Sequence, residues 1–274
     1  MSKILQAQST YYVLAALILI FVFLIGATFY SYLNEVIIRL PKKEDLTHGR
    51  SKCPHCGHAF AMKEALPIFS HLRYKGKCIY CFEPLPKRKL VIEILGGCLA
   101  VLVVCHYRIS LEALLMVLLY GVLTVISFID ADTQEIPPVL NAIILGLGVI
   151  RLLLFRLSIV SFLESVIGFF CISLLLYVIV IIVPDGFGGG DIKMMAAAGF
   201  FLGWKANVFA FFIGLVMGGA YGVYLLLRKK KDKNEHFAFG PFLSIGIAIS
   251  AYAEIGNIVM NQYLEPFRKF FEYM

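Results

Sequence analysis

Charged residues are scarce in this sequence of 274 residues. They make up only 16% of the chain, while hydrophobic residues make up 60% and the mean hydropathy is +0.83. Because a soluble domain has about 25% charged residues, this composition indicates a membrane protein. Strict alternation of polar and apolar residues is also missing from the apolar runs, which argues against a transmembrane β-barrel. The sequence therefore predicts an all-α protein that spans a membrane several times.

The continuous apolar runs predict about eight transmembrane helices. A helix needs roughly 17–25 apolar residues to cross a bilayer. The runs lie at about 11–33, 90–106, 111–130, 139–156, 160–183, 191–204, 206–227 and 239–258. The first run lacks an A-x-A-like cleavage site and is expected to be a helix rather than a signal peptide. The sixth run is short, so seven helices is the alternative.

Basic residues gather in two segments, and their placement predicts the orientation of the chain. One segment is Pro41–Lys89, and the other contains Arg228–Lys231 and Lys233. The positive-inside rule places both segments in the cytoplasm. With eight spans, both termini are then extracytoplasmic. Because the lipid bilayer accounts for these basic residues, no nucleic-acid partner is expected.

Four cysteines in the first basic segment predict a metal site. Cys53 and Cys56 are separated from Cys78 and Cys81 by 21 residues, the pattern of a four-cysteine zinc centre. A cytoplasmic segment disfavours disulfides, and a segment this short needs a metal to supply folding energy. We predict structural zinc, with disulfides or free thiols as the alternatives. The other cysteines lie in apolar runs and are assigned no role: Cys98, Cys105 and Cys171.

A glycine-rich stretch, Pro184–Lys193, contains the first candidate catalytic residue. Four glycines precede Asp191, and we expect them to permit positive φ angles and close packing of the backbone. A carboxylate at a membrane boundary is costly, so Asp191 is a candidate functional residue. The alternative is that Asp191 only caps a helix.

Asp130 is the second candidate, because it ends the third apolar run on the same predicted side of the membrane. Asp132 and Glu135 lie farther from the apolar run and are expected to be ordinary interface charges. Two neighbouring aspartates share one proton, so that one carboxylate activates water while the other polarises a carbonyl. This chemistry is peptide hydrolysis. The residues alone equally permit a transporter in which the pair binds a cation, or two helix caps.

Several motifs then resemble those of type IV prepilin peptidases, which are bacterial intramembrane aspartic proteases with a GxGD motif. These motifs follow one another in order along nearly the whole chain: 29–41, 51–56, 66–81, 87–93, 127–137, 186–203 and 239–242. The most specific is 186–203, GFGGGDIKMMAAAGFFLG. A transporter would often show a second broken helix of the same kind, and no second glycine-rich aspartate segment occurs.

The resemblance implies that Asp130 and Asp191 are the catalytic pair. It further implies removal of the basic leader from prepilins or pseudopilins at the cytoplasmic face of the bacterial inner membrane. Methylation of the new N-terminus by S-adenosylmethionine is implied for many members, together with zinc bound by the four cysteines. A third class of function, a structural scaffold for a pilus or secretion machine, would need neither aspartate.

Three parts are expected along the chain. They are a first transmembrane helix (1–40), a cytoplasmic zinc-binding and methyltransferase loop (41–89) and a membrane-embedded peptidase domain (90–274). One departure from the family is Pro138, which follows Pro137 where members commonly have aspartate, and it is expected to alter the loop rather than the activity. Small residues at 196–199 and 214–222 are candidates for close helix packing, with a substrate helix or within the protein. The specific pilin substrate and the oligomeric state are not determined by the sequence.

Overall fold

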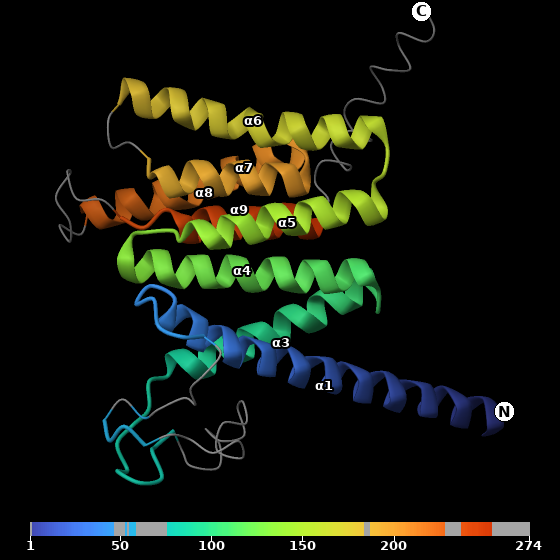
Figure 1. Ribbon diagram of the computed structural model, residues 1–274. Helices are drawn as coiled ribbons and strands as arrows, with labels where there is room; N and C mark the ends of the chain where they lie inside the picture. Colours follow the sequence, from blue (N-terminus) through green and yellow to red (C-terminus); the bar gives the residue numbers. More distant parts are fainter. Residues whose placement is uncertain are drawn as a thin grey trace, which may run out of the picture. The chain divides into compact units, whose positions relative to one another are not determined.

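The computed structural model describes residues 2–46, 53, 55–58, 76–183, 187–227 and 237–253. These residues form eight helices, and their only β-pairing is an isolated bridge between Lys77 and Pro84 (Figure 1). The chain divides into two compact units, Met1–Val117 and Leu118–Met274. The all-α prediction is confirmed.

Close helix packing organises the first unit. It contains α1 (Ser2–Arg39), α3 (Arg88–Tyr107) and the beginning of α4 (Leu111–Thr133). Glycines let α1 and α3 approach each other, because a Cβ atom at Gly26 would lie only 2.6 Å from the Cβ atom of Ala100. Ser31 of α1 also donates a hydrogen bond of 2.7 Å to the buried carboxylate of Glu93 on α3.

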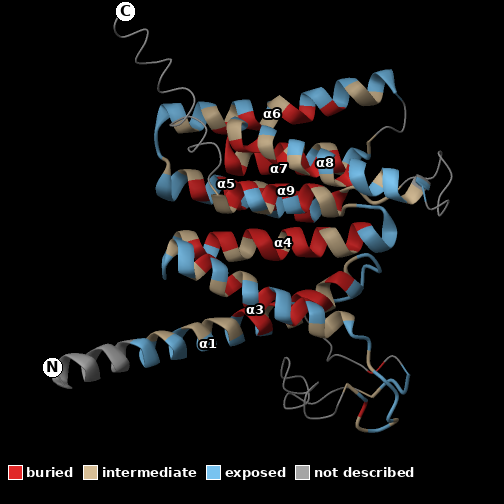
Figure 2. Ribbon diagram, turned by 180° about the vertical axis from the view of Figure 1, so that it is seen from behind, coloured by how far each residue is buried: buried red, intermediate tan, exposed pale blue. Residues whose placement is uncertain are grey.

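The second unit is built around α7. It contains the rest of α4, α5 (Pro138–Phe155), α6 (Ile159–Ile182), α7 (Gly189–Leu202), α8 (Trp204–Leu227) and α9 (Gly240–Ala253). Helix α7 contacts α5, α6, α8 and α9, and most of its residues are buried. Helix α6 differs from α7 in burial, because much of its surface is exposed, as Figure 2 shows.

Local signals set the ends of these helices. Pro138 opens α5, where its missing N–H is not needed and its fixed φ suits the first turn. The Ser158 side chain caps α6 by accepting a hydrogen bond of 3.1 Å from the backbone N–H of Ser161. Gly203 has φ +84°, which lets α7 end and α8 begin at the next residue.

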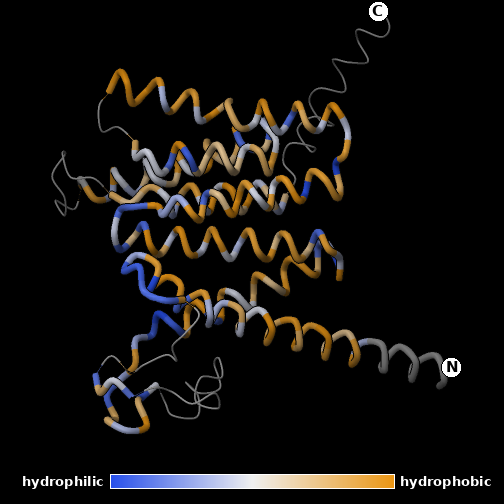
Figure 3. The backbone as a smooth tube through the Cα atoms, viewed as in Figure 1, coloured by the Kyte–Doolittle hydropathy of each residue, from blue (hydrophilic) through white to orange (hydrophobic). Residues whose placement is uncertain are grey.

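Six helices in the described part of the chain are long and apolar enough to cross a membrane. They are predominantly hydrophobic, as Figure 3 shows for α6, which is mostly orange. The other two, α7 and α9, have 14 described residues each. At 1.5 Å per residue, α7 is about 21 Å long, shorter than the roughly 30 Å hydrocarbon core. The multi-pass prediction is confirmed, and the short sixth run forms a helix, α7, that is shorter than this core.

Candidate active site and metal centre

Asp130 lies one turn before the end of α4 and is 5% exposed. Its Oδ2 atom accepts a hydrogen bond of 2.8 Å from the backbone N–H of Gly240, the first residue of α9. By contrast, Asp132 and Glu135 are exposed. The structure therefore presents Asp130, and not its acidic neighbours, to the interior of the second unit.

Asp191 lies in the first turn of α7 and is 7% exposed. Its Oδ2 atom accepts a hydrogen bond of 3.3 Å from the backbone N–H of Gly188, while its own N–H donates to the Gly188 carbonyl at 3.0 Å. The expected capping role is thus present, at the third position of the helix rather than at the N-cap. Capping and catalysis are compatible, since the capping bond uses only one carboxylate oxygen.

The two aspartates meet within the second unit. Although 60 residues lie between them in the chain, their carboxylates are close enough to interact electrostatically. In the described residues, each carboxylate accepts one backbone hydrogen bond, and both bonds go to Oδ2. The Oδ1 atoms of both carboxylates accept no hydrogen bond from the described residues. This arrangement can hold a proton and activate a water molecule.

Gly190, directly before Asp191, acts by its small size and not by a positive φ angle. Among the described residues, Gly188, Gly189 and Gly190 all have φ outside the left-handed region, which corrects the expectation from the sequence. A Cβ atom at Gly190 would lie 2.9 Å from the Cβ atom of Ile136, in the connection between α4 and α5. The short side chain lets the two aspartate-bearing segments approach each other. Gly186 lies outside the described residues.

The four cysteines come together in the first unit, and all of them are free thiols. Their sulfur atoms lie within 4.8 Å of one another, with Cys53 to Cys81 at 3.8 Å and Cys56 to Cys78 at 3.9 Å. Tetrahedral zinc with bonds of about 2.3 Å requires sulfur–sulfur distances of about 3.8 Å. The cluster therefore fits a metal ion, and the disulfide alternative does not describe it.

Two matching turns position these sulfur atoms. The backbone N–H of Gly57 donates to the Cys53 carbonyl at 2.9 Å, and the N–H of Phe82 donates to the Cys78 carbonyl at 3.0 Å. The residue after each pair has a positive φ, +70° at Gly57 and +58° at Phe82. Each C-x-x-C pair is thus a tight turn that directs two thiols to the same point.

The electrostatics of the cluster favour a cation. Backbone N–H groups of Cys81 and Tyr80 lower the pKa of the Cys78 thiol to about 7, which favours its thiolate. The N–H of Glu83 acts in the same sense on Cys81, but burial and the neighbouring sulfur atoms outweigh it and raise the pKa of Cys81 to about 12. Neighbouring thiolates repel one another, so a bound cation would be needed for all four thiols to lose their protons.

Comparisons with known proteins match both units. Residues 24–107 match the family described as the bacterial peptidase A24 N-terminal domain, and residues 117–223 match the type IV leader peptidase family. Prepilin leader peptidase/N-methyltransferase of Burkholderia pseudomallei is 32% identical over 218 residues, which cover 78% of this chain and 70% of the relative. The protein of the same name from Aeromonas hydrophila is 31% identical over 255 residues, covering 82% of this chain and 87% of the relative.

The chain belongs to the type IV leader peptidase family. A further relative, from Pseudomonas aeruginosa, bears the same name and is 29% identical over 248 residues, covering 81% of this chain and 86% of that protein. No solved structure gave a significant match. Membership confirms the predicted enzyme class and a multi-pass inner-membrane protein, and it does not support a cation-coupled transporter.

The structure adds one residue beside the candidate active site that the sequence reasoning missed. Asn141 lies in the first turns of α5 and is 5% exposed. Its Nδ2 atom donates a hydrogen bond of 3.5 Å to the carbonyl of Gly190, directly before Asp191. Its Oδ1 atom is buried without a hydrogen-bond partner among the described residues. A signal was present, because an asparagine is unusual in an apolar run.

The small residues of α7 pack within the second unit itself. Ala196, Ala197 and Ala198 are buried, and a Cβ atom at Gly199 would clash with the carbonyl of Gly168 on α6. Of the two roles that the sequence left open for this stretch, the structure shows internal packing. In the stretch at 214–222, Gly214 packs internally, since a Cβ there would lie 3.0 Å from the side chain of Leu243, whereas a Cβ at Gly219 would meet nothing within 4 Å.

Proposed function

We propose that this chain is an intramembrane aspartic endopeptidase that removes the basic leader from prepilins or pseudopilins, with Asp130 and Asp191 as its catalytic pair. Cleavage takes place at the cytoplasmic face of the inner membrane. The single observation that carries this proposal is the meeting of two buried carboxylates from α4 and α7 in one helical unit. Relatives named as prepilin leader peptidases support the class of substrate.

The proposed reaction follows from the pair of carboxylates. One aspartate is ionised and takes a proton from a water molecule, whose oxygen attacks the carbonyl carbon of the scissile peptide bond. The other aspartate is protonated and donates its proton to the carbonyl oxygen, which forms a neutral gem-diol. When the C–N bond breaks, a proton passes to the leaving nitrogen, and a free amine and a carboxylic acid result. The backbone bonds from Gly240 and Gly188 hold the two carboxylates in position.

The second proposed activity is N-methylation of the new N-terminus, and it rests on the relatives' names alone. S-adenosylmethionine would supply the methyl group, and no residue of this chain is assigned to it. Cys53, Cys56, Cys78 and Cys81 would hold zinc, which stabilises the 41–89 segment. In this proposal, 1–40 is the first membrane helix, 41–89 is the zinc-binding and methyltransferase loop and 90–274 is the peptidase domain.

The proposed orientation places both termini outside the cytoplasm and the aspartates near the cytoplasmic face. The two basic segments, which follow α1 and α8, support this orientation through the positive-inside rule. Because α7 is shorter than the hydrocarbon core, this proposal is compatible with Asp191, in its first turn, lying below the membrane surface. A substrate would therefore be cut close to the point where its apolar helix enters the membrane.

Cleavage of a purified prepilin in detergent tests the proposal. Asp130→Asn and Asp191→Asn keep the size and the hydrogen-bond acceptor while removing the acid, and each is expected to reduce cleavage by at least about 10³-fold. Asp132→Asn is the matched control and is expected to retain wild-type cleavage. Cleavage by both Asp130→Asn and Asp191→Asn would refute the aspartyl mechanism. If Asp132→Asn lost cleavage while Asp130→Asn kept it, Asp132 would be the partner of Asp191.

A further inference from the structure

The two aspartates are held by backbone N–H groups in matching positions. The N–H of Gly188 donates to Asp191 at 3.3 Å, and the N–H of Gly240 donates to Asp130 at 2.8 Å. Gly188 is the N-cap of α7, and Gly240 is the first residue of α9. Each glycine directly follows a phenylalanine, so the dipeptide Phe-Gly occurs at the beginning of both helices.

These two phenylalanines, Phe187 and Phe239, contact each other although they lie far apart in the chain. Their ring centroids are 5.5 Å apart and the rings are inclined at 62°, the edge-to-face arrangement that aromatic pairs favour. Both side chains are half-buried. The contact joins the segment before α7 to the segment before α9, and these are the segments that supply the two N–H donors.

Helix α8 provides the surface on which this aromatic pair lies. A Cβ atom at Gly218 would lie 2.5 Å from the ring of Phe239, so the ring occupies the space that a side chain at this position would fill. Phe211, also on α8, has its ring centroid 6.5 Å from that of Phe187. Both rings are therefore supported by α8 as well as by each other.

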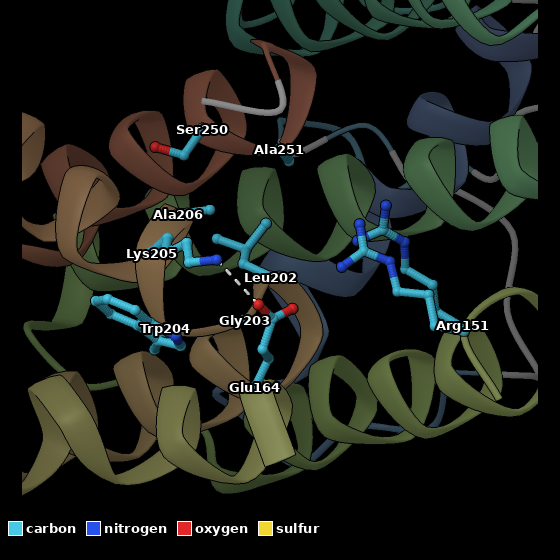
Figure 4. Close-up of a pocket in the computed structure, with 10 residues that line it drawn as sticks. Arg151, Glu164, Leu202, Gly203, Trp204, Lys205, Ala206, Ser250 and Ala251 are labelled. Atoms are coloured by element: carbon cyan, nitrogen blue, oxygen red, sulfur yellow. Dashed lines mark hydrogen bonds and ion pairs between the residues drawn. The ribbon is translucent and has the colours of Figure 1, made fainter. Parts of the chain in front are cut away.

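The opposite end of α7 is held by polar contacts instead. Arg151 donates a hydrogen bond of 3.2 Å to the carbonyl of Phe201, in the last turn of α7. Lys205, at the beginning of α8, forms an ion pair of 3.0 Å with Glu164 of α6 beside a cavity of about 40 Å³ (Figure 4). Asp191 lies ten residues before Phe201, about 15 Å along the helix axis. Its position therefore depends on contacts at the first turn of α7.

We propose that Phe187 and Phe239 are positioning residues that fix the separation of the two aspartates. A shift of either ring moves the adjoining glycine, whose N–H directs one carboxylate. Two carboxylates that share a proton need a short and constant separation, which the contact between the rings maintains. The rings act through the glycines and do not touch the reacting atoms. This proposal rests on the proposed aspartyl mechanism and adds the side chains that keep its two acids in position.

Steady-state cleavage of a purified prepilin by the full-length protein in detergent tests the proposal. Phe187→Ala and Phe239→Ala are each expected to lower kcat by about 10–100-fold, because a misplacement of about 1 Å can cost about 10²-fold in rate. KM is expected to stay within about twofold, since neither ring binds the substrate. Phe187→Leu keeps an apolar side chain and is expected to recover part of the lost kcat. A raised KM with unchanged kcat would overturn the proposal, because the rings would then bind substrate.

The double variant Phe187→Ala/Phe239→Ala tests whether the two rings act as one unit. Either single change already removes the contact between them, so kcat of the double variant is expected to lie within about threefold of the more severe single variant. Losses that multiply in the double variant would show that the two residues act independently, and this result would overturn the proposal.

Matched variants separate positioning from general damage to the fold. Gly218→Ala adds a methyl group against the Phe239 ring and is expected to lower kcat about tenfold, whereas Gly219→Ala, whose Cβ meets nothing within 4 Å, is expected to cleave like wild type. Phe169→Ala removes a half-buried ring that pairs with Phe170 at 5.0 Å on α6, and kcat is expected to stay within about twofold. Equal kcat in the two glycine variants, or a loss in Phe169→Ala as large as in Phe239→Ala, would overturn the proposal.

Hydrogen exchange measures the same contact without cleavage. Phe239→Ala is expected to speed amide exchange in residues 187–191 by about threefold or more and to leave residues 195–202 unchanged, because the contact ties only the first of these segments to α9. Unchanged exchange at 187–191 would overturn the proposal. A failure of the aspartyl mechanism is recognised separately, since Asp130→Asn and Asp191→Asn would then still cleave while the exchange result still reports on the two rings.

Discussion

A single backbone N–H at residue 240 distinguishes Asp130 from the acidic residues near it. Position after an apolar run was enough to predict that Asp130, rather than Asp132 or Glu135, turns inward. The sequence could not show what holds it there, since the donor at Gly240 is 110 residues away in the chain. Any residue except proline can supply a backbone N–H donor, so this hydrogen bond could be identified only from the fold.

Gly240→Ala is expected to disturb the catalytic pair. A Cβ atom at this position would lie 2.8 Å from Oδ2 of Asp130, so the carboxylate must shift or lose its hydrogen bond. Because a misplacement of about 1 Å can cost about 10²-fold in rate, we expect kcat for prepilin cleavage to fall by about 10–100-fold. Steady-state cleavage of a purified prepilin measures this effect.

Gly189→Ala is the matched control for this prediction. It lies in the first turn of α7, and a Cβ atom there would meet nothing within 4 Å. We expect kcat within about twofold of wild type, since surface changes away from such contacts are close to neutral. A similar loss in Gly189→Ala and Gly240→Ala would show that the effect comes from glycine replacement in general and not from contact with Asp130.

At the scale of local elements, the two C-x-x-C turns form the candidate metal centre. Their spacing predicted the site, and the structure shows sulfur–sulfur distances suited to tetrahedral zinc. The sequence could not show that Phe82 takes the positive φ that Gly57 takes in the first turn. Turn geometry is shared by the two pairs even though the residue after each pair differs.

Cys78→Ser is expected to release the metal. Removing one thiolate leaves three ligands, so zinc content measured by mass spectrometry should fall from about one per chain to well below half. Trypsin is then expected to cut the 41–89 segment faster, because metal binding supplies its folding energy. Cys98→Ser, an exposed cysteine in α3, is the control and should keep both zinc and protease resistance. Unchanged zinc content in Cys78→Ser would exclude the four-cysteine site.

The contact between α6 and α7 depends on glycine. A Cβ atom at Gly199 would clash with the carbonyl of Gly168, and the Asn207 side chain donates to that same carbonyl at 3.1 Å. We expect Gly199→Ala to lower the thermal unfolding midpoint by about 5 °C, because overpacking forces the helices apart. Gly146→Ala on α5, where a Cβ meets nothing within 4 Å, should stay within about 2 °C of wild type. An unchanged midpoint in Gly199→Ala would show that these helices adjust at no cost.

At the scale of the whole molecule, the proposed topology is open to a direct test. An alkaline phosphatase fused after Met274 is expected to be active, because the C-terminus is proposed to lie outside the cytoplasm. The same reporter fused after Leu227, before the second basic cluster, is expected to be inactive. Activity only in the Leu227 fusion would reverse the orientation, and equal activity in both would change the number of spans between them.

The sequence by itself determined the helical membrane fold and the enzyme family, and it singled out the two aspartates and the four cysteines as candidate site residues. These features depend on local composition and spacing, such as long apolar runs and paired C-x-x-C motifs. Only the tertiary structure decided that Gly190, before Asp191, provides space against Ile136 rather than an unusual φ angle. It also brought together Phe187 and Phe239 beside the glycines that bind the two aspartates. Such sites depend on which helix faces contact each other, and a sequence of nearly uniform apolar runs contains little information about those contacts.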